Sequence, residues 1–363
     1  MATDSALVAV VVGHQVDLIR FSNSMAASVN PHLTNISKYV REVLYQWDKL
    51  ETKKDMNEAV RLITEMMQAE LGAFTEEFES DLNALIKEEV AFQYDVAKSA
   101  IGAGTAVSRP TIKATTQFIT SIPMVLNGNA ITVDQYIGDY TPSQIDKVKQ
   151  KIIAGWTDGL TTREIAQSIT GTKSVKGVIQ ASQRSAYMMA KDVSTHTSAQ
   201  TKSKVFQDNS DLIVGEKIVV TLDSKTSPIC QDLGSQDGGG KEYYYAEDGR
   251  NFPRPPFHPN CRSTTVPILA PEYREIAEEG RTRPAVVDSK AIQVPADTNW
   301  MDLAKQHPSL AEQSLGKSRA AVLDEMSAKE FTDAAYNRLG QQITLDQLAA
   351  SNKKAASVLQ ESQ

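Results

Sequence analysis

The chain lacks several features that mark whole classes of protein. It has no long apolar run: the stretch from Leu7 to Val12 is six residues, far short of the roughly 20 that cross a bilayer. No Lys or Arg precedes that stretch, so a secretory signal is not expected and the protein should be soluble and made in a cytoplasm. Cysteine is limited to Cys230 and Cys261, and the 363 residues contain neither an internal repeat nor a low-complexity tract.

A formal net charge of −7 excludes nucleic-acid binding by the overall charge of the chain. The charge is unevenly distributed, however. Residues 65–95 hold nine acidic residues and one basic residue, whereas residues 142–191 hold eight basic and three acidic residues. An ordinary solvated helix face explains either segment, but the basic one also offers contacts to DNA phosphates. These candidate contacts are Lys147, Lys149, Lys151, Arg163, Lys173, Lys176, Arg184 and Lys191.

Proline is absent between residues 33 and 109, and apolar residues recur there at helical spacing. One apolar stripe covers residues 36–50, and a second begins after Asp55 and repeats every 11 residues. A continuous helix over residues 55–100 would be about 65–70 Å long. Such a helix buries its stripe only against another helix, another domain or a partner protein. Residues 1–100 are therefore predicted to form a helical docking region.

Glycine and proline divide the rest of the chain. Residues 101–141 contain short β-branched runs and are predicted to form a linker or a small β-rich segment. Residues 142–270 begin with helices, one of which starts at a capping box of Thr161 and Glu164 and ends at Gly171. A further helix is predicted over residues 181–206.

After these helices the pattern changes to strands. GEKIVVTLD and STTVPIL, on either side of the cysteine-containing loop, are strand-like. Helices followed by strands indicate an α+β fold: a long helical N-terminal region, a central α+β module over residues 142–270 with a Cys/His-Pro-x-Cys loop, and a helical tail. Residues 271–298 are predicted to be a polar linker and residues 299–363 the helical C-terminal tail.

Cys230, His258 and Cys261 offer two sulfur ligands and one nitrogen ligand, and His258 and Cys261 are spaced so that both can reach one metal ion. Structural zinc takes four ligands, and the fourth would come from Asp223 or Asp232. A disulfide between the two cysteines is an alternative, although a reducing cytoplasm disfavours it during assembly. Two buried free thiols that pack as small apolar side chains are the third alternative.

Two other activities are compatible with parts of the sequence. His258 beside a cysteine has the composition of a nucleophile and its base, so a Cys/His-centred enzyme or transferase-like domain is one alternative. Residues 160–182 have the outline of a helix-turn-helix, which makes a DNA-binding protein another. The triplet at residues 238–240 is not a phosphate-binding loop, because it lacks the Gly-Lys-Ser/Thr order and a following helix.

The cysteine-containing loop reads L-D-x-x-T-S-P-x-C followed by P-P-x-H-P-x-C-R, and it resembles the signature of the phage Mu F-like head morphogenesis proteins. Elements of the tail are also similar to that family, so that the resemblance covers about residues 140–350. The chain departs from the family where Ser263 stands in place of a third cysteine, and where Ala190 to Asp192 replace an Arg-Thr-Glu-like run. The loop residues that carry the resemblance are Asp223, Ser227, Pro228, Cys230, Gly234, Pro256, His258, Pro259, Cys261 and Arg262.

The resemblance implies a minor head protein of a tailed bacteriophage without catalytic activity. Such a protein is made in the bacterial host cytoplasm and resides inside the virion head near the portal vertex. The implied partners are the portal protein, the major capsid or scaffolding protein and packaged double-stranded DNA, with no membrane during assembly. The protein would assist procapsid assembly and DNA packaging or delivery. No cofactor is required, although a structural zinc ion is compatible with the loop.

Overall fold

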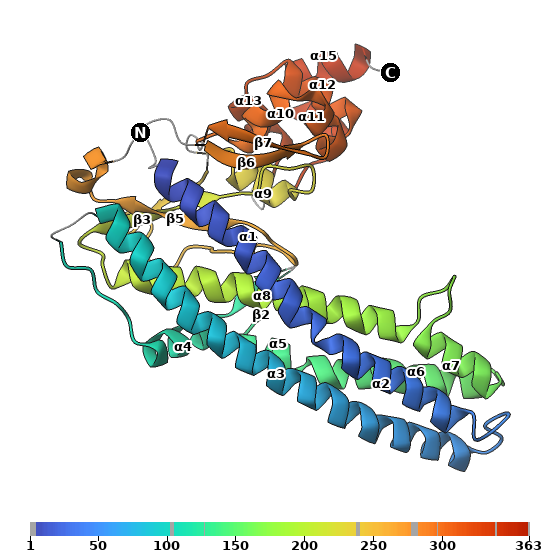
Figure 1. Ribbon diagram of the computed structural model, residues 1–363. Coiled ribbons are helices and arrows are strands. Elements are labelled where there is room, and N and C mark those ends of the chain that lie inside the picture. The colour runs from blue at the N-terminus through green and yellow to red at the C-terminus, as the bar shows by residue number, and fades with distance from the viewer. Residues whose placement is uncertain are drawn as a thin grey trace. The chain divides into compact units, whose positions relative to one another are not determined.

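The chain has an α+β fold in which long helices accompany small antiparallel sheets (Figure 1). The computed structural model describes residues 5–101, 105–126, 128–236, 240–276, 282–295, 297–337 and 340–361. These residues divide into two compact units. The helical unit comprises Leu18–Glu88 and Ile112–Thr197, and the sheet unit comprises the described residues of Met1–Asp17, Glu89–Thr111 and Ser198–Gln363.

The helical unit is built from helices and one short hairpin. Phe74 packs edge-on against Phe78 and Tyr140, and the Tyr140 hydroxyl donates to the Ser182 carbonyl at 3.0 Å. Helix α7 packs against α2 and α6, and the three lie together at one end of this unit (Figure 1). Its elements are α2 (Val29–Leu44), α4 (Ile112–Ser121), β1 (Met124–Leu126), β2 (Asn129–Ile131), α5 (Val133–Gly138), α6 (Tyr140–Thr157) and α7 (Thr162–Thr170), with parts of α1 (Ser5–Ala27), α3 (Lys53–Ile101) and α8 (Val178–Gln207).

The helix predictions for this unit are confirmed in detail. The apolar stripe after Asp55 forms one continuous helix, α3, in which stripe residues such as Ile63, Phe74 and Phe78 are buried. Thr161 and Glu164 form the reciprocal capping box that starts α7, and α7 ends at Gly171, whose φ of 77° suits glycine.

The β-rich reading of residues 111–126 is wrong for most of that segment. Residues 112–121 form α4, because Thr115 and Ile119 lie four apart and are both buried on one helix face. Thr116 and Thr120 accommodate the helix by donating their hydroxyls to backbone carbonyls one turn earlier. Only the hairpin of β1 and β2 matches the predicted small β element.

The sheet unit is centred on strand β3 (Ile213–Val219), which lies between β4 (Glu242–Tyr244) and β5 (Thr264–Leu269) in antiparallel register. Neighbouring side chains of β3 point to opposite faces. Val219 joins the core formed with α1, α3 and α8, whereas Ile218 joins the core formed with the C-terminal tail. The segment between β3 and β5 contains α9 (Pro228–Leu233) and the cysteine-containing loop.

The segment predicted as a polar linker, residues 271–298, contains the 3-10 helix η1 (Pro271–Ile276) and a hairpin of β6 (Thr282–Val287) and β7 (Lys290–Pro295). Strand β6 alternates exposed and buried residues. One of its buried residues is Arg283, so the strand does not show the alternation of apolar and polar residues by which a strand is recognised in a sequence. The predicted helical tail is confirmed, as short helices gathered around this hairpin (Figure 1). They are α10 (Trp300–Gln306), α11 (Pro308–Leu315), α12 (Lys317–Asp324), α13 (Ala328–Ala335), α14 (Leu345–Ser351) and α15 (Lys353–Glu361).

In the described part of the chain, each helix is either too short or too polar to cross a lipid bilayer. The apolar residues near the N-terminus belong to α1, where Val8 and Val11 are buried in the core of the sheet unit.

The buried His196 of α8 should make the stability of the helical unit depend on pH. Burial lowers the pKa of His196 from 6.5 to about 4, although hydrogen bonds to the carbonyls of Ile119 and Ile122 oppose the shift. Because the folded-state pKa is lowered, the stabilisation is complete above pH 6.5 and is lost as the pH falls towards 4. We expect the free energy of unfolding to fall by about 3 kcal/mol over that window because of this residue.

Urea unfolding of His196→Gln at a series of pH values tests the expectation, since glutamine keeps a donor but does not titrate. The variant should show a shallower pH dependence than the wild-type protein. His307→Gln, which alters a histidine of the tail, should leave the dependence unchanged. Parallel curves for wild type and His196→Gln would contradict the assignment.

Candidate metal centre

A four-residue turn brings His258 and Cys261 together. The Cys261 N–H donates to the His258 carbonyl at 3.1 Å, which closes a turn over Pro259 and Asn260. Proline supplies the fixed φ required at the second position, and Asn260, with a φ of 60°, tolerates the left-handed conformation at the third. The sequence His-Pro-Asn-Cys therefore forms a turn whose first and last side chains lie close to each other.

Cys230 reaches the same point from α9. Pro228 occupies the first turn of this helix, where its missing N–H is harmless, and Ser227 precedes it. Gly234 ends the helix against β3, because a Cβ there would lie 2.2 Å from the Val220 side chain. This close approach holds α9, and Cys230 with it, against the sheet.

The three predicted ligands converge. The ligand atoms of Cys230, His258 and Cys261 all lie within 4.8 Å of one another. Cys230 Sγ is 3.2 Å from His258 Nε2 and 3.9 Å from Cys261 Sγ. Both cysteines are buried and are not joined by a disulfide, while His258 is half-buried. The disulfide alternative is therefore not the state of this structure.

The two thiols differ in acidity. Burial raises the pKa of Cys261, but hydrogen bonds from Cys230 and His258 outweigh it, and the net pKa lies well below the ordinary thiol value. The hydrogen bond to Cys261, together with burial, raises the pKa of Cys230.

Neither aspartate considered as a fourth ligand belongs to the cluster. Asp223 binds Arg262 through two hydrogen bonds of 2.5 and 2.9 Å, and it also accepts from Thr226 and the Lys225 N–H. Burial raises the pKa of Asp223, but these bonds, led by that of Arg262, lower it below its usual value. Asp232 accepts from Gln236 instead. The residues whose ligand atoms converge are Cys230, His258 and Cys261, without either aspartate.

The C-terminal tail packs against the cysteine-containing loop and α9. The buried indole of Trp300 donates to the Asp223 carbonyl at 3.0 Å, and the Tyr336 hydroxyl donates to Gln231 of α9 at 2.8 Å. Cys230, Cys261 and Trp300 belong to one apolar core. Pro256, one of the loop residues that carry the resemblance, is buried, and the peptide bond from Pro255 to Pro256 is cis. The sequence did not indicate which of these residues touch, because the contacts join distant segments.

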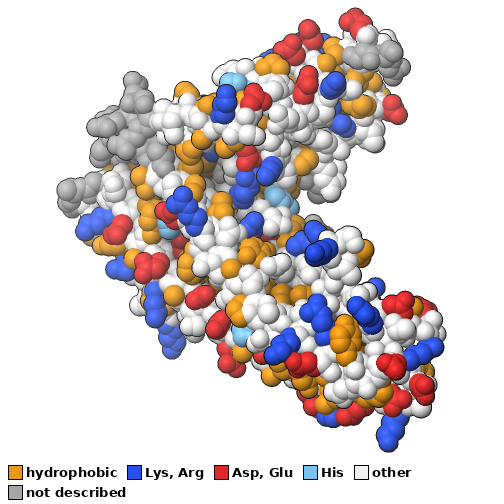
Figure 2. Space-filling model, turned by 45° about the vertical axis from the view of Figure 1, so that its right-hand side comes forward, with side chains coloured by type: hydrophobic (Ala, Val, Ile, Leu, Met, Phe, Trp, Pro, Cys, Tyr) orange, Lys and Arg blue, Asp and Glu red, His pale blue; other side chains and the backbone are white. Residues whose placement is uncertain are grey.

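The predicted DNA contacts lie in the helical unit but not on one helix face. Lys147 and Lys151 are one turn apart on α6, whereas Lys149 projects from another side and approaches Asp146 at 4.0 Å. Lys191 is half-buried, and the exposed members of the set are Lys151, Arg163, Lys173, Lys176 and Arg184. In Figure 2 basic and acidic side chains are interspersed over the visible surface. The set does not form one uniform basic stripe.

The helix-turn-helix alternative gains no support from this arrangement. Residues 171–177 separate α7 from α8, a longer connection than the usual three or four residues. Residues 192–203 of α8 are buried, whereas a recognition helix presents its face to the DNA groove.

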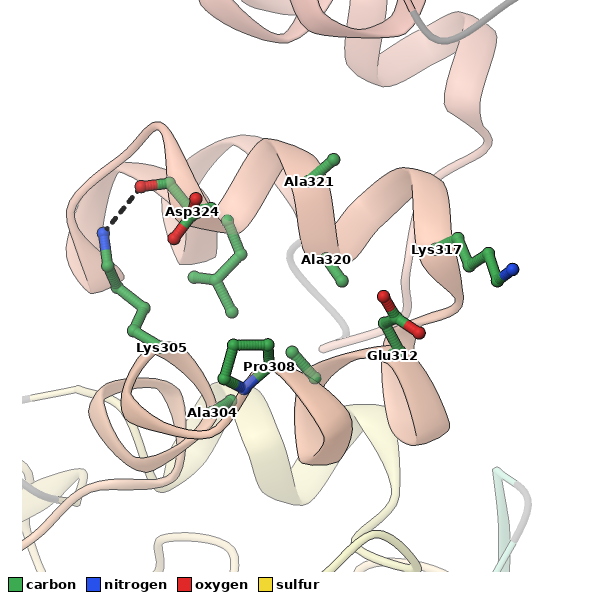
Figure 3. A pocket seen from close by; sticks show the side chains of 10 residues that line it. Ala304, Lys305, Pro308, Glu312, Lys317, Ala320, Ala321 and Asp324 are labelled. Atoms are coloured by element: carbon green, nitrogen blue, oxygen red, sulfur yellow. Dashed lines mark hydrogen bonds between the residues drawn. The ribbon is translucent and has the colours of Figure 1, made fainter.

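A cavity of about 190 Å³ lies among the tail helices α10, α11 and α12, away from the cysteines (Figure 3). Lys305 closes one end by donating to the Asp324 carbonyl at 3.2 Å, and Glu312 and Lys317 lie at the other end (Figure 3). Alanine and proline side chains form its apolar wall. The cavity could not be anticipated from sequence patterns, because its lining comes from three separate helices.

Comparison with protein-family models, with curated proteins and with solved structures found no match to this chain.

Replacement of Arg262 by lysine should loosen the loop beside the cysteines. Lysine keeps the charge but cannot form both hydrogen bonds to Asp223, so we expect a loss of about 1–3 kcal/mol in the free energy of unfolding. Chemical unfolding measures the loss. Arg250→Lys is the control, because Arg250 is exposed and its side chain contacts the Ser210 hydroxyl and the ring of Tyr245 without an acidic partner among the described residues. Equal stability of the two variants would show that the Asp223–Arg262 pair contributes little.

Proposed function

We propose that this chain is a minor head protein of a tailed bacteriophage. It would bind the portal or the capsid interior, and assist procapsid assembly and DNA packaging or delivery. One observation carries the proposal. The cysteine-containing loop and the tail, which separately resemble Mu F-like proteins, pack into one core, with Trp300 of the tail bonded to Asp223 of the loop. Because the loop and the tail pack into one core, their two resemblances belong to a single structural module. They support a relationship to Mu F-like proteins better than two separate motifs would.

The enzyme alternative receives less support. Cys230 and His258 lie at a distance suited to a nucleophile and its base. However, the cavity that borders them holds about 20 Å³, room for one water molecule and not for a substrate. The hydrogen bond with Cys261, together with burial, raises the pKa of Cys230, which opposes nucleophilic reactivity of that thiol, whereas the pKa of Cys261 is lowered. The small cavity is therefore the observation that counts against an enzyme.

Docking on the portal would use the acidic face of α3. Glu76 and Glu79 are exposed on this helix, and its apolar stripe is already buried within the protein. Deletion of residues 1–100 would be uninformative, because α1 and α3 contribute buried residues such as Val8 and Val96 to the core of the sheet unit. Charge reversal at the surface leaves that core intact.

We therefore expect the full chain to co-elute with the portal protein of the same phage at a defined ratio after co-expression and size-exclusion chromatography. Glu76→Lys with Glu79→Lys should abolish co-elution through reversal of the docking charge. Glu312→Lys with Glu325→Lys makes the same change in net charge on exposed residues of the tail and should leave co-elution unchanged. A wild-type monomer that ignores the portal would contradict docking on the portal and leave the capsid interior or DNA as its anchor.

Binding to packaged DNA would be non-specific and dependent on salt. We expect Lys147→Gln with Lys151→Gln, on one face of α6, to lower the slope of log affinity against log salt by as much as about 2. Lys38→Gln with Lys87→Gln removes the same charge from exposed positions outside the predicted set. Fluorescence anisotropy with duplex DNA compares the two variants. Equal slopes would show that α6 is not the DNA-binding surface.

A further inference from the structure

We infer that the turn at residues 258–261 and α9 together form a binding site for one Zn²⁺ ion, coordinated by Cys230 Sγ, His258 Nε2, Cys261 Sγ and a water molecule. The inference rests on the geometry of these side chains and does not depend on the proposed function.

Two of the three distances between the ligand atoms are close to those of tetrahedral coordination, and all three atoms lie within 4.8 Å of one another. With Zn–S bonds of about 2.3 Å and a Zn–N bond of about 2.0–2.1 Å, two sulfur ligands lie about 3.8 Å apart, and a sulfur and a nitrogen lie about 3.5 Å apart. The two cysteine sulfurs are 3.9 Å apart, and Cys230 Sγ lies 3.2 Å from His258 Nε2. An ion therefore fits among the three atoms after only small movements.

The surrounding bonds orient the imidazole as a zinc ligand requires. His258 Nδ1 lies 2.9 Å from the Pro259 carbonyl, which can only accept, so Nδ1 carries the proton. Nε2, which lies 3.2 Å from Cys230 Sγ, is then the ring nitrogen left to bind an ion. A backbone carbonyl that holds the other ring nitrogen is the usual support of a metal-binding histidine. The Ser263 hydroxyl donates to Cys230 Sγ at 3.1 Å and supports that ligand in the same way.

The fourth position has room for water. The cavity of about 20 Å³ is lined by Cys230, His258 and Ser227, among others, and this volume accepts one water molecule. Ser227 precedes α9 but makes no side-chain cap hydrogen bond, and its buried hydroxyl interacts with Cys230. A water bound to zinc in this cavity would give that hydroxyl a further partner. Three protein ligands with a water is an established form of zinc site.

The chemistry of the donors selects the ion. Two thiolates and an imidazole suit Zn²⁺, whereas Mg²⁺ and Ca²⁺ prefer oxygen ligands. The ion would link α9 to the turn that precedes β5, and these segments are 28 or more residues apart in sequence. Zinc would thus add a second connection where Asp223 and Arg262 already join the loop to the strand end.

The test uses the full chain without an affinity tag, purified under reducing conditions and freed of metal by a chelating resin. We expect it to bind one Co²⁺ per chain, with a thiolate-to-cobalt charge-transfer band and the intense visible bands of tetrahedral cobalt. Zn²⁺ should displace the cobalt and raise the melting temperature of the protein. These measurements on the wild-type chain stand even if a variant fails to fold.

Cys230→Ser, Cys261→Ser and His258→Asn should each weaken Co²⁺ binding by at least about 100-fold, because each removes a ligand. Ser227→Ala should keep the charge-transfer band and weaken binding by about 10-fold. His307→Asn, which alters a histidine outside the cluster, should bind cobalt as the wild-type protein does. Circular dichroism identifies any variant that has lost its fold.

Three outcomes would overturn the inference. The first is a folded wild-type protein with two reactive thiols that binds no Co²⁺. The second is cobalt binding that persists in a folded Cys230→Ser or His258→Asn protein. The third is a protein, purified without reductant, whose mass is lower by the two hydrogens of a disulfide and which cannot bind metal after reduction.

Discussion

The side chain and the carbonyl of one residue, Asp223, connect three distant parts of the chain. The carboxylate accepts two hydrogen bonds from Arg262, which follows the His-Pro-Asn-Cys turn, and the carbonyl accepts the indole N–H of Trp300 at the start of the tail. Removal of one partner would leave a largely buried charge unpaired, at a cost of several kcal/mol. The end of strand β3, the loop and the tail therefore hold one another in a single arrangement, and the metal centre depends on that arrangement.

The candidate metal centre combines a local and a long-range element. The turn that presents His258 and Cys261 needs only its own residues, because Pro259 and Asn260 favour the required backbone angles. Cys230 joins them through the packing of α9 on the sheet. The centre can exist only when the sheet unit is folded, so zinc binding would report on the folding of that unit.

The helices were the most predictable part of the fold. An 11-residue apolar repeat without proline determines α3, and a Thr–Glu pair determines where α7 begins. The errors arose where local residue type and tertiary burial disagree. The β-branched residues of α4 favour a strand, but burial of Thr115 and Ile119 on one face selects a helix. The hairpin of β6 and β7 was missed because Arg283 occupies a buried position of its alternating pattern.

The sequence by itself determined the class of the fold, the long helices and the residue types of the metal centre, because periodicity, caps and turn residues act over only a few positions. It left open whether the cysteines form a disulfide, bind a metal or stay apart, and it suggested Asp223 and Asp232 as ligands. Only the tertiary structure placed Cys230 beside His258 and assigned Asp223 to Arg262. Those outcomes depend on contacts between segments tens of residues apart, and such contacts are decided by packing of the whole core.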